Sequence, residues 1–136
     1  MTQTTNEDAS EEQREQTVRP FADGGTLSLD DVFRILSNRR RRLALYLLFD
    51  ASGSVDRDEL ASQLVAWERG VDVDDVPRDA VTTLNVELEH VHLPRLREAN
   101  VVSYGRDERT LTLTETATRL KPYLDVSRDE DFEALD

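Results

Sequence analysis

The sequence contains no cysteine, a single lysine and no apolar run near the length of a membrane-spanning helix. The absence of cysteine excludes a disulfide framework, a thiol nucleophile and a cysteine-ligated metal. The N-terminus is polar and acidic, which argues against a secretory signal or a membrane anchor. We therefore expect a cytoplasmic protein that does not bind membranes.

Almost all of the positive charge is arginine. The 17 basic residues are 16 Arg and Lys121, against 29 Asp and Glu, which gives a formal net charge of −12. Many carboxylates with almost no lysine are typical of a halophilic cytoplasm, where charged surfaces keep proteins soluble in concentrated salt. An ordinary acidic protein from a genome with Arg-favouring codons is the alternative. Either way, the charge argues against a protein that coats DNA without sequence preference, which would be basic.

The 136 residues divide into three segments. Residues 1–25 are acidic, poor in large apolar side chains and end in Gly24-Gly25, which predicts a disordered tail. Residues 26–125 hold nearly all of the apolar periodicity and predict one domain. Residues 126–136 include the run RDEDFEALD and predict a solvated acidic tail.

Within the domain, the apolar spacing predicts helices first and a hairpin near the end. Four helices are expected near residues 29–36, 39–50, 57–67 and 78–99, with Pro94 kinking or restarting the fourth. Strands are expected at residues 101–104 and 110–114, and a last helix through about residue 124. With a short extended pair at 54–55, this is the order of a winged helix-turn-helix, a mainly α fold with a small β-hairpin.

Three stretches resemble winged helix-turn-helix regulators. LSNRRRRLAL at residues 36–45 is similar to their first helix, VDRDELASQL at 55–64 to their positioning helix, and HLPRLREANVV at 92–102 to the end of the recognition helix and the entry to the wing. Asn100 replaces the usual glycine, and asparagine tolerates the left-handed backbone needed there. The run before the wing is similar to a haloarchaeal winged-helix-like family of unknown function. The resemblance covers about residues 27–120 and implies a fold rather than an activity.

The sequence departs from the resembled pattern in two ways. Leu64 and His92 are 28 positions apart, farther than in typical relatives, and an acidic stretch appears inserted between them, namely Asp72, Asp74, Asp75 and Asp79. The expected recognition helix also carries Glu87 and Glu89, which would repel phosphates if they faced DNA.

One functional hypothesis for such a fold is binding of double-stranded DNA, with the helix from about residue 78 to 99 in the major groove. The candidate DNA contacts are Arg78, Thr82, Thr83 and Asn85 on this helix, Arg106 and Arg109 at the wing tip, and Arg39, Arg40, Arg41 and Arg42 on the second helix. The four consecutive arginines have an alternative role as ion-pair partners that stabilise the fold. The wing tip is alternatively a polar turn, neutralised by its own acids.

No enzymatic or metal chemistry is expected. His90 and His92 are two positions apart, so on a helix their rings point about 200° apart and cannot share an ion. A core or pairing role for one histidine is favoured. The sequence has no phosphate-binding glycine loop, nucleophile elbow or Ser/His/Asp pattern. We expect no cofactor.

Two functions therefore stay open. The first is a DNA-binding transcription regulator of a halophilic archaeon, working as a homodimer, since the last amphipathic helix either closes the domain or pairs two chains. The second is a winged-helix module for protein interaction or dimerisation that binds no DNA, which the acidic insert, Glu87 and Glu89 favour. A continuous positive face formed by the candidate arginines would favour the first function. Acids that interrupt this face would favour the second function.

Overall fold

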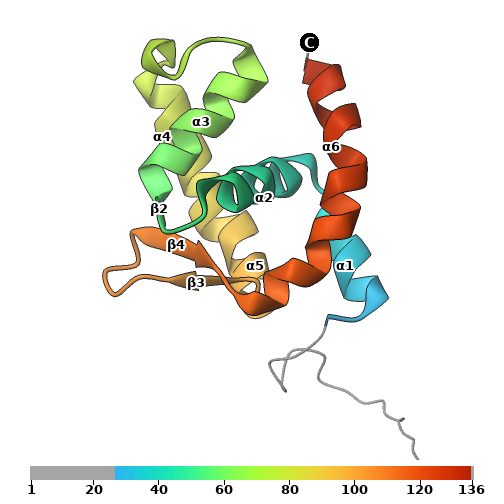
Figure 1. Cartoon of the computed structure of the whole chain (residues 1–136). Coiled ribbons are helices and arrows are strands. Elements are labelled where there is room, and N and C mark those ends of the chain that lie inside the picture. Colours follow the sequence, from blue (N-terminus) through green and yellow to red (C-terminus); the bar gives the residue numbers. More distant parts are fainter. Residues whose placement is uncertain (1–26, 136) are drawn as a thin grey trace, which may run out of the picture.

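The computed structural model describes residues 27–135, so the expected N-terminal tail at residues 1–25 lies outside them. As expected, the chain is mainly helical with a small antiparallel sheet (Figure 1). The elements are α1 (Leu29–Leu36), α2 (Arg39–Ala51), β2 (Val55–Asp56), α3 (Arg57–Arg69), the 3-10 turn η1 (Val73–Asp75), α4 (Arg78–Glu87), the π-helical turn η2 (Leu88–His92), α5 (Leu93–Glu98), β3 (Val102–Tyr104), β4 (Thr110–Leu113), the 3-10 helix η3 (Glu115–Leu120) and α6 (Lys121–Leu135).

The first three helices begin at side chains that cap them. Ser28 forms a capping box with Asp31 at the start of α1. The side chain of Asn38 accepts a hydrogen bond of 3.1 Å from a first-turn N–H of α2, and Asp56 accepts two at the start of α3. Each cap satisfies N–H groups that have no partner inside the helix, which fixes where the helix begins.

The sheet has three strands in the order β2-β4-β3, so the expected hairpin gains one short strand. Val55 pairs with Leu111 in the β2–β4 register, and β3 pairs with the other edge of β4. Asn100 has φ 62°, the left-handed conformation expected there, and turns the chain from α5 towards β3. The element order and this sheet are consistent with a winged-helix-like arrangement, in which α3 and α4 form the helix pair and β3 and β4 the wing.

The irregular turn η2 divides the fourth expected helix, as Pro94 predicts. Pro94 is the second residue of α5, directly after η2. Proline has no N–H and its ring clashes with the carbonyl four residues earlier, so a regular α-helix cannot run through this point. The wider π turn separates the two helices and keeps Leu88 and Leu93 both buried.

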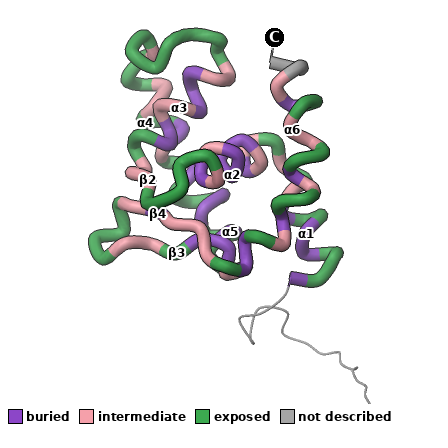
Figure 2. The backbone as a smooth tube through the Cα atoms, in the orientation of Figure 1, coloured by how far each residue is buried: buried purple, intermediate pink, exposed green. Residues whose placement is uncertain are grey.

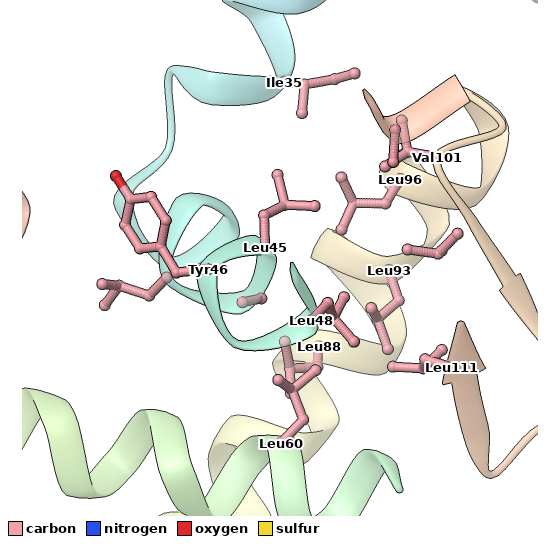
Figure 3. Packing of buried hydrophobic residues seen from close by; sticks show 14 of the residues in the cluster. Ile35, Leu45, Tyr46, Leu48, Leu60, Leu88, Leu93, Leu96, Val101 and Leu111 are labelled. Atoms are coloured by element: carbon pink, nitrogen blue, oxygen red, sulfur yellow. The ribbon is translucent and has the colours of Figure 1, made fainter. Parts of the chain in front are cut away.

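The core lies between α2 and the elements around it (Figure 3). Leu45 and Leu48 of α2 are buried together with Leu60 of α3, Leu93 of α5 and Leu111 of β4. Burying each such side chain stabilises the fold by about 1.5–3 kcal/mol. This core fixes α4 and the wing relative to α2.

The expected C-terminal tail is wrong for the residues described, because α6 continues to residue 135. Asp131 is 7% exposed and accepts hydrogen bonds from Arg42 and Tyr46. The Phe132 ring lies 4.8 Å from that of Trp67 and 5.6 Å from that of Tyr46. The last helix therefore closes the domain, and Trp67 packs against the core.

The helices lie on two sides of α2. Figure 1 places α3 and α4 on one side and α1 and α6 on the other, with the sheet at one end of α2 and α3. Figure 2 shows that the loop between α3 and α4 and the tip of the wing consist mostly of exposed residues. No helix within residues 27–135 is long and apolar enough to cross a membrane.

Candidate functional site

The outer face of α4 is the face that a recognition helix would present to DNA. Pro77 precedes the helix with an extended backbone (φ −67°, ψ 136°) and so starts it without needing an N–H partner. Leu84 is buried against the core, whereas Thr82 and Thr83 are exposed. Val86 is 50% exposed, an apolar side chain on the same outward surface. The structure therefore leaves the two candidate threonines accessible.

A groove with a volume of 660 Å³ runs along this face between α3, η1 and α4. We call it the α4 groove; its lining residues are Asp58, Ser62, Val73, Asp74, Val76, Arg78, Val81, Thr82, Asn85, Val86 and Glu89. Four are valines, three are acids and one is an arginine. The acidic stretch noted in the sequence contributes its η1 residues as one wall. The lining thus combines apolar side chains with more acids than bases.

Acids on this face pair with the arginines nearest to it. Arg109 Nη2 of the wing lies 3.4 Å from Asp58 Oδ2, and Arg57 Nη1 lies 4.0 Å from Glu89 Oε1. Asp58 also accepts a hydrogen bond from the side-chain amide of Asn85. Asn85, a candidate base-reading residue, is thus half-buried and held by a carboxylate.

Two candidate arginines at this face are free. Arg78 at the start of α4 and Arg106 at the wing tip are exposed, and neither forms an ion pair within residues 27–135. Arg78 and Arg106 lie on separate elements, and the paired side chains of Asp58 and Arg109 belong to the same face. The positive charge of the wing and of α4 is therefore not continuous.

The consecutive arginines of α2 serve the fold. Arg40 donates two hydrogen bonds of 2.7 Å to Glu68 of α3 and one of 2.8 Å to Glu87 of α4. These bonds raise the pKa of Arg40 despite the opposing effect of burial. Because bidentate pairs of this kind hold a guanidinium in a fixed geometry, Arg40 ties α2 to the helix pair.

Arg41 and Arg42 hold the end of α1. Arg41 is buried and donates to the Ile35 carbonyl at 2.9 Å, and burial lowers its pKa. Arg42 donates to the Leu36 carbonyl at 2.7 Å and to both carboxylate oxygens of Asp131 at 2.8 and 2.9 Å. Both arginines thus satisfy carbonyls that α1 leaves without a partner at its C-terminal end.

Arg39 is the exposed member of this group. Its Nη2 lies 3.4 Å from the backbone carbonyl of Asp131. Successive residues on a helix point about 100° apart, so four adjacent arginines cannot form one patch. The alternative, structural reading of Arg39 to Arg42 agrees with these contacts.

His92 has the pairing role expected for one histidine. It is 2% exposed, and its Nε2 lies 2.7 Å from Glu87 Oε2. Burial alone would raise the pKa of Glu87, but the hydrogen bonds from Arg40 and His92 outweigh it, so this pKa is lowered. His90 is exposed. No group of residues within the described part of the chain has the composition and geometry of a metal site.

Sequence reasoning did not identify the α4 groove. Val73 and Val86 are 38% and 50% exposed, but their spacing in the sequence cannot reveal that both line the same groove. The acid-rich loop was the available signal. The sequence shows this loop as an acidic insertion, and Asp74 of that insertion lines the groove.

Comparison with known proteins identifies a family but no function. A model described as "Domain of unknown function (DUF7344)" matches residues 33–112, more than half of the chain. The matched region contains α2 to α5 and the sheet, including the groove. The description names neither a fold nor an organism, so the haloarchaeal winged-helix resemblance stays a prediction. No curated protein and no solved structure matches the chain.

Proposed function

Because the chain belongs to a family of domains of unknown function (DUF7344), we propose its role from the site alone: a winged-helix module that binds a protein partner through the outer face of α4. The proposal assigns the chain no catalytic residue, cofactor or metal. The observation that carries it is the alternation of acids with arginines across the face where DNA would lie, where Asp58 pairs with Arg109 and Glu89 with Arg57.

The charges of this face oppose duplex DNA. Phosphate contacts supply most of the affinity of DNA-binding proteins, and those contacts come from arginine and lysine side chains. Here Arg57 and Arg109 already face carboxylates, and Asp74 and Glu89 line the groove. A docked duplex would bring phosphates towards these acids, which disfavours binding at ordinary ionic strength.

The same face suits a protein partner. It combines a groove, exposed valines and a rim of charged groups, which is the usual composition of a protein-binding surface with an apolar centre and a polar rim. The ion pairs Arg40–Glu68 and Arg40–Glu87 hold α4 firmly on α2 and α3. A partner would therefore meet a preformed surface, which lowers the cost of binding.

DNA binding is a second candidate, because Arg78 and Arg106 are exposed without an ion pair among the described residues and Thr82 and Thr83 point outwards from α4. The composition predicts a cell with concentrated salt, and in 1 M salt the Debye length is only about 3 Å. The repulsion between DNA phosphates and the neighbouring acids would then weaken. A regulator in such a cell would rely on close contacts at these four residues. The two candidates make opposite predictions for one cross-linking experiment.

The test places a photo-cross-linking amino acid at Thr82, at the centre of the outer face of α4, in the cells that make the protein. The matched control is Thr118, an exposed threonine on η3. We expect a cross-linked product from position 82 that resists nuclease and is destroyed by protease, with none of that size from position 118. A product that nuclease removes would overturn the proposal in favour of DNA.

A titration with DNA checks the same point with purified protein. Fluorescence anisotropy is measured with a duplex from the region upstream of the gene and with an unrelated duplex, at low salt and in about 2 M KCl, where charge is screened. We expect no saturable binding. Binding that prefers the native duplex and is weakened by Arg106→Ala with Arg109→Ala would establish a DNA reader.

A further inference from the structure

Building on the proposed function, we propose that the α4 groove binds a cationic segment of a partner protein that carries apolar side chains along one face. The segment would insert the apolar side chains between α3, η1 and α4 and place its basic groups on the acids of the rim. The proposal names the chemistry of the partner from the apolar and charged residues that line the groove.

Four valines give the groove an apolar part. Val73 and Val86 are 38% and 50% exposed, and Val76 and Val81 are half-buried beside them. Single exposed apolar residues are common on protein surfaces, but several that gather in a hollow are typical of a binding site. Covering them would remove apolar surface from water and favour association.

The rim of the groove selects positive charge. Asp58, Asp74 and Glu89 line the groove with a single base, Arg78, while Arg109 and Arg57 reach Asp58 and Glu89 from outside the lining. Asp72 and Asp75 are exposed beside Asp74 in the same loop, so acids outnumber bases here by five to three. A partner arginine could bind such carboxylates through two parallel hydrogen bonds. This charge complementarity identifies a basic rather than an acidic occupant.

The ion pairs at the rim are ones that a partner could replace. Arg109 and Asp58 are 3.4 Å apart, and their side chains are 61% and 56% exposed. Glu89 is 52% exposed and lies 4.0 Å from Arg57. Exposed pairs of this kind contribute between zero and about 1 kcal/mol, so a partner cation could share or take over these carboxylates at little cost.

The charge also argues against two other occupants. Residues 1–25 carry six acids and two arginines, so this chain's own N-terminal segment has the same sign as the rim. A second copy carries a net charge of −12 and offers the same excess of acid. DNA has the same sign again. A basic segment of a different protein fits where these three do not.

The test uses the full chain and a synthetic probe. The probe is a peptide with leucines at helical spacing i, i+3, i+4 and i+7 and arginines at flanking positions, with a scrambled peptide of equal composition as its comparison. Binding is measured by calorimetry, and its location by NMR shifts of valine methyl groups. Both are run at 0.15 M and about 1 M salt, because electrostatic binding to any acidic surface weakens as the Debye length falls to about 3 Å.

Matched variants separate this groove from general acidity. Asp58→Asn with Glu89→Gln removes two charges at the groove, and Asp125→Asn with Asp129→Asn removes two on α6, both exposed positions. Val86→Asp is compared in the same way with Val126→Asp, since both valines are exposed. Folding of every variant is checked by circular dichroism.

We expect the groove variants to lower the affinity for the peptide with helically spaced leucines by about tenfold, or ~1.4 kcal/mol. The α6 variants should lower it by less than about twofold. The shifted methyl groups should be those of the four groove valines. Equal loss in both variant sets, or equal affinity for the scrambled peptide, would overturn the inference.

The remaining outcomes separate the inference from the proposed function. No binding of the peptide with helically spaced leucines, together with a protein cross-link at Thr82, would reject a cationic occupant and retain a protein-binding face. Duplex DNA that shifts the same valine methyl groups would overturn both.

Discussion

A buried carboxylate, that of Asp131, helps to hold the C-terminal half of α6 to the domain, and replacing it tests the packing directly. Asp131 accepts hydrogen bonds from Arg42 Nε at 2.8 Å, from Arg42 Nη2 at 2.9 Å and from the Tyr46 hydroxyl at 2.5 Å. Its side chain is 9% exposed and that of Arg42 is 22% exposed. Asp131→Ala therefore removes the acceptor of three hydrogen bonds in a site with little water.

The expected cost follows from the burial. Removing one partner of a fully buried ion pair destabilises a protein by about 3–5 kcal/mol. Arg42 is partly exposed and keeps its bond to the Leu36 carbonyl, so water and this carbonyl reduce the loss. We expect a fall in the free energy of unfolding of about 2–3 kcal/mol. For a domain of this size, the melting temperature would fall by about 10 °C or more.

The assay is urea denaturation followed by circular dichroism and by tryptophan fluorescence. Trp67 packs edge-on against Phe132 at 4.8 Å, so its emission reports whether α6 is docked. The matched control is Asp129→Ala, an exposed aspartate two positions away on the same helix, which should change stability by less than about 0.5 kcal/mol. A double-mutant cycle with Arg42→Met should give a coupling energy above about 1 kcal/mol.

One result would refute this reasoning. If Asp131→Ala costs no more than Asp129→Ala and leaves the Trp67 emission unchanged, the carboxylate does not hold α6. The acidic C-terminus would then behave as the solvated tail that composition suggests.

Three further predictions concern pH, assembly and the wing. Burial would raise the pKa of Asp131 and Glu87, but the hydrogen bonds of each carboxylate outweigh burial and lower both pKa values. The stability that these carboxylates contribute is therefore present at neutral pH and is lost as the pH falls below about 4. Urea midpoints that stay constant from pH 7 to 3 would contradict this. The expected homodimer would use the exposed Phe33 of α1, whose ring lies 6.0 Å from that of Tyr123 of α6. Phe33→Glu should therefore yield monomers in light scattering, and a monomeric wild type would reject the expectation. Gly105→Ala would place a methyl carbon 2.1 Å from a threonine hydroxyl of β4. It should lower the free energy of unfolding by about 1–3 kcal/mol and speed amide exchange in the wing. Unchanged exchange would contradict the turn geometry.

The parts of the fold that local chemistry determines were predictable from the sequence. Ser28, Asn38 and Asp56 cap helices because their side chains bond N–H groups two or three residues away. Pro94 interrupts its helix for an equally local reason, and Asn100 takes the left-handed turn at the end of α5. Such signals need no knowledge of the rest of the chain.

The errors came from contacts between distant residues. The run RDEDFEALD has the composition of a solvated tail, yet Asp131 is buried because Arg42 and Tyr46, more than 80 positions earlier, bind it. Phe132 finds Trp67 and Tyr46 in the same way. Composition describes the average environment of a segment and cannot reveal one buried pair.

Contacts between distant residues also decide which candidate arginines are free, and this bears on how an arginine-rich, acidic sequence is interpreted. Arg40 lies in the densest basic run of the chain, but Glu68 and Glu87, from two other helices, occupy its guanidinium. When acids outnumber bases by 29 to 17, an arginine has many possible carboxylate partners, and its fork geometry favours fixed pairs over free contacts. An arginine run in such a protein therefore predicts ion pairs within the fold before it predicts phosphate binding. Charges left over after that pairing, such as those of Asp74 and Arg78 on the α4 groove, are the ones that select a partner.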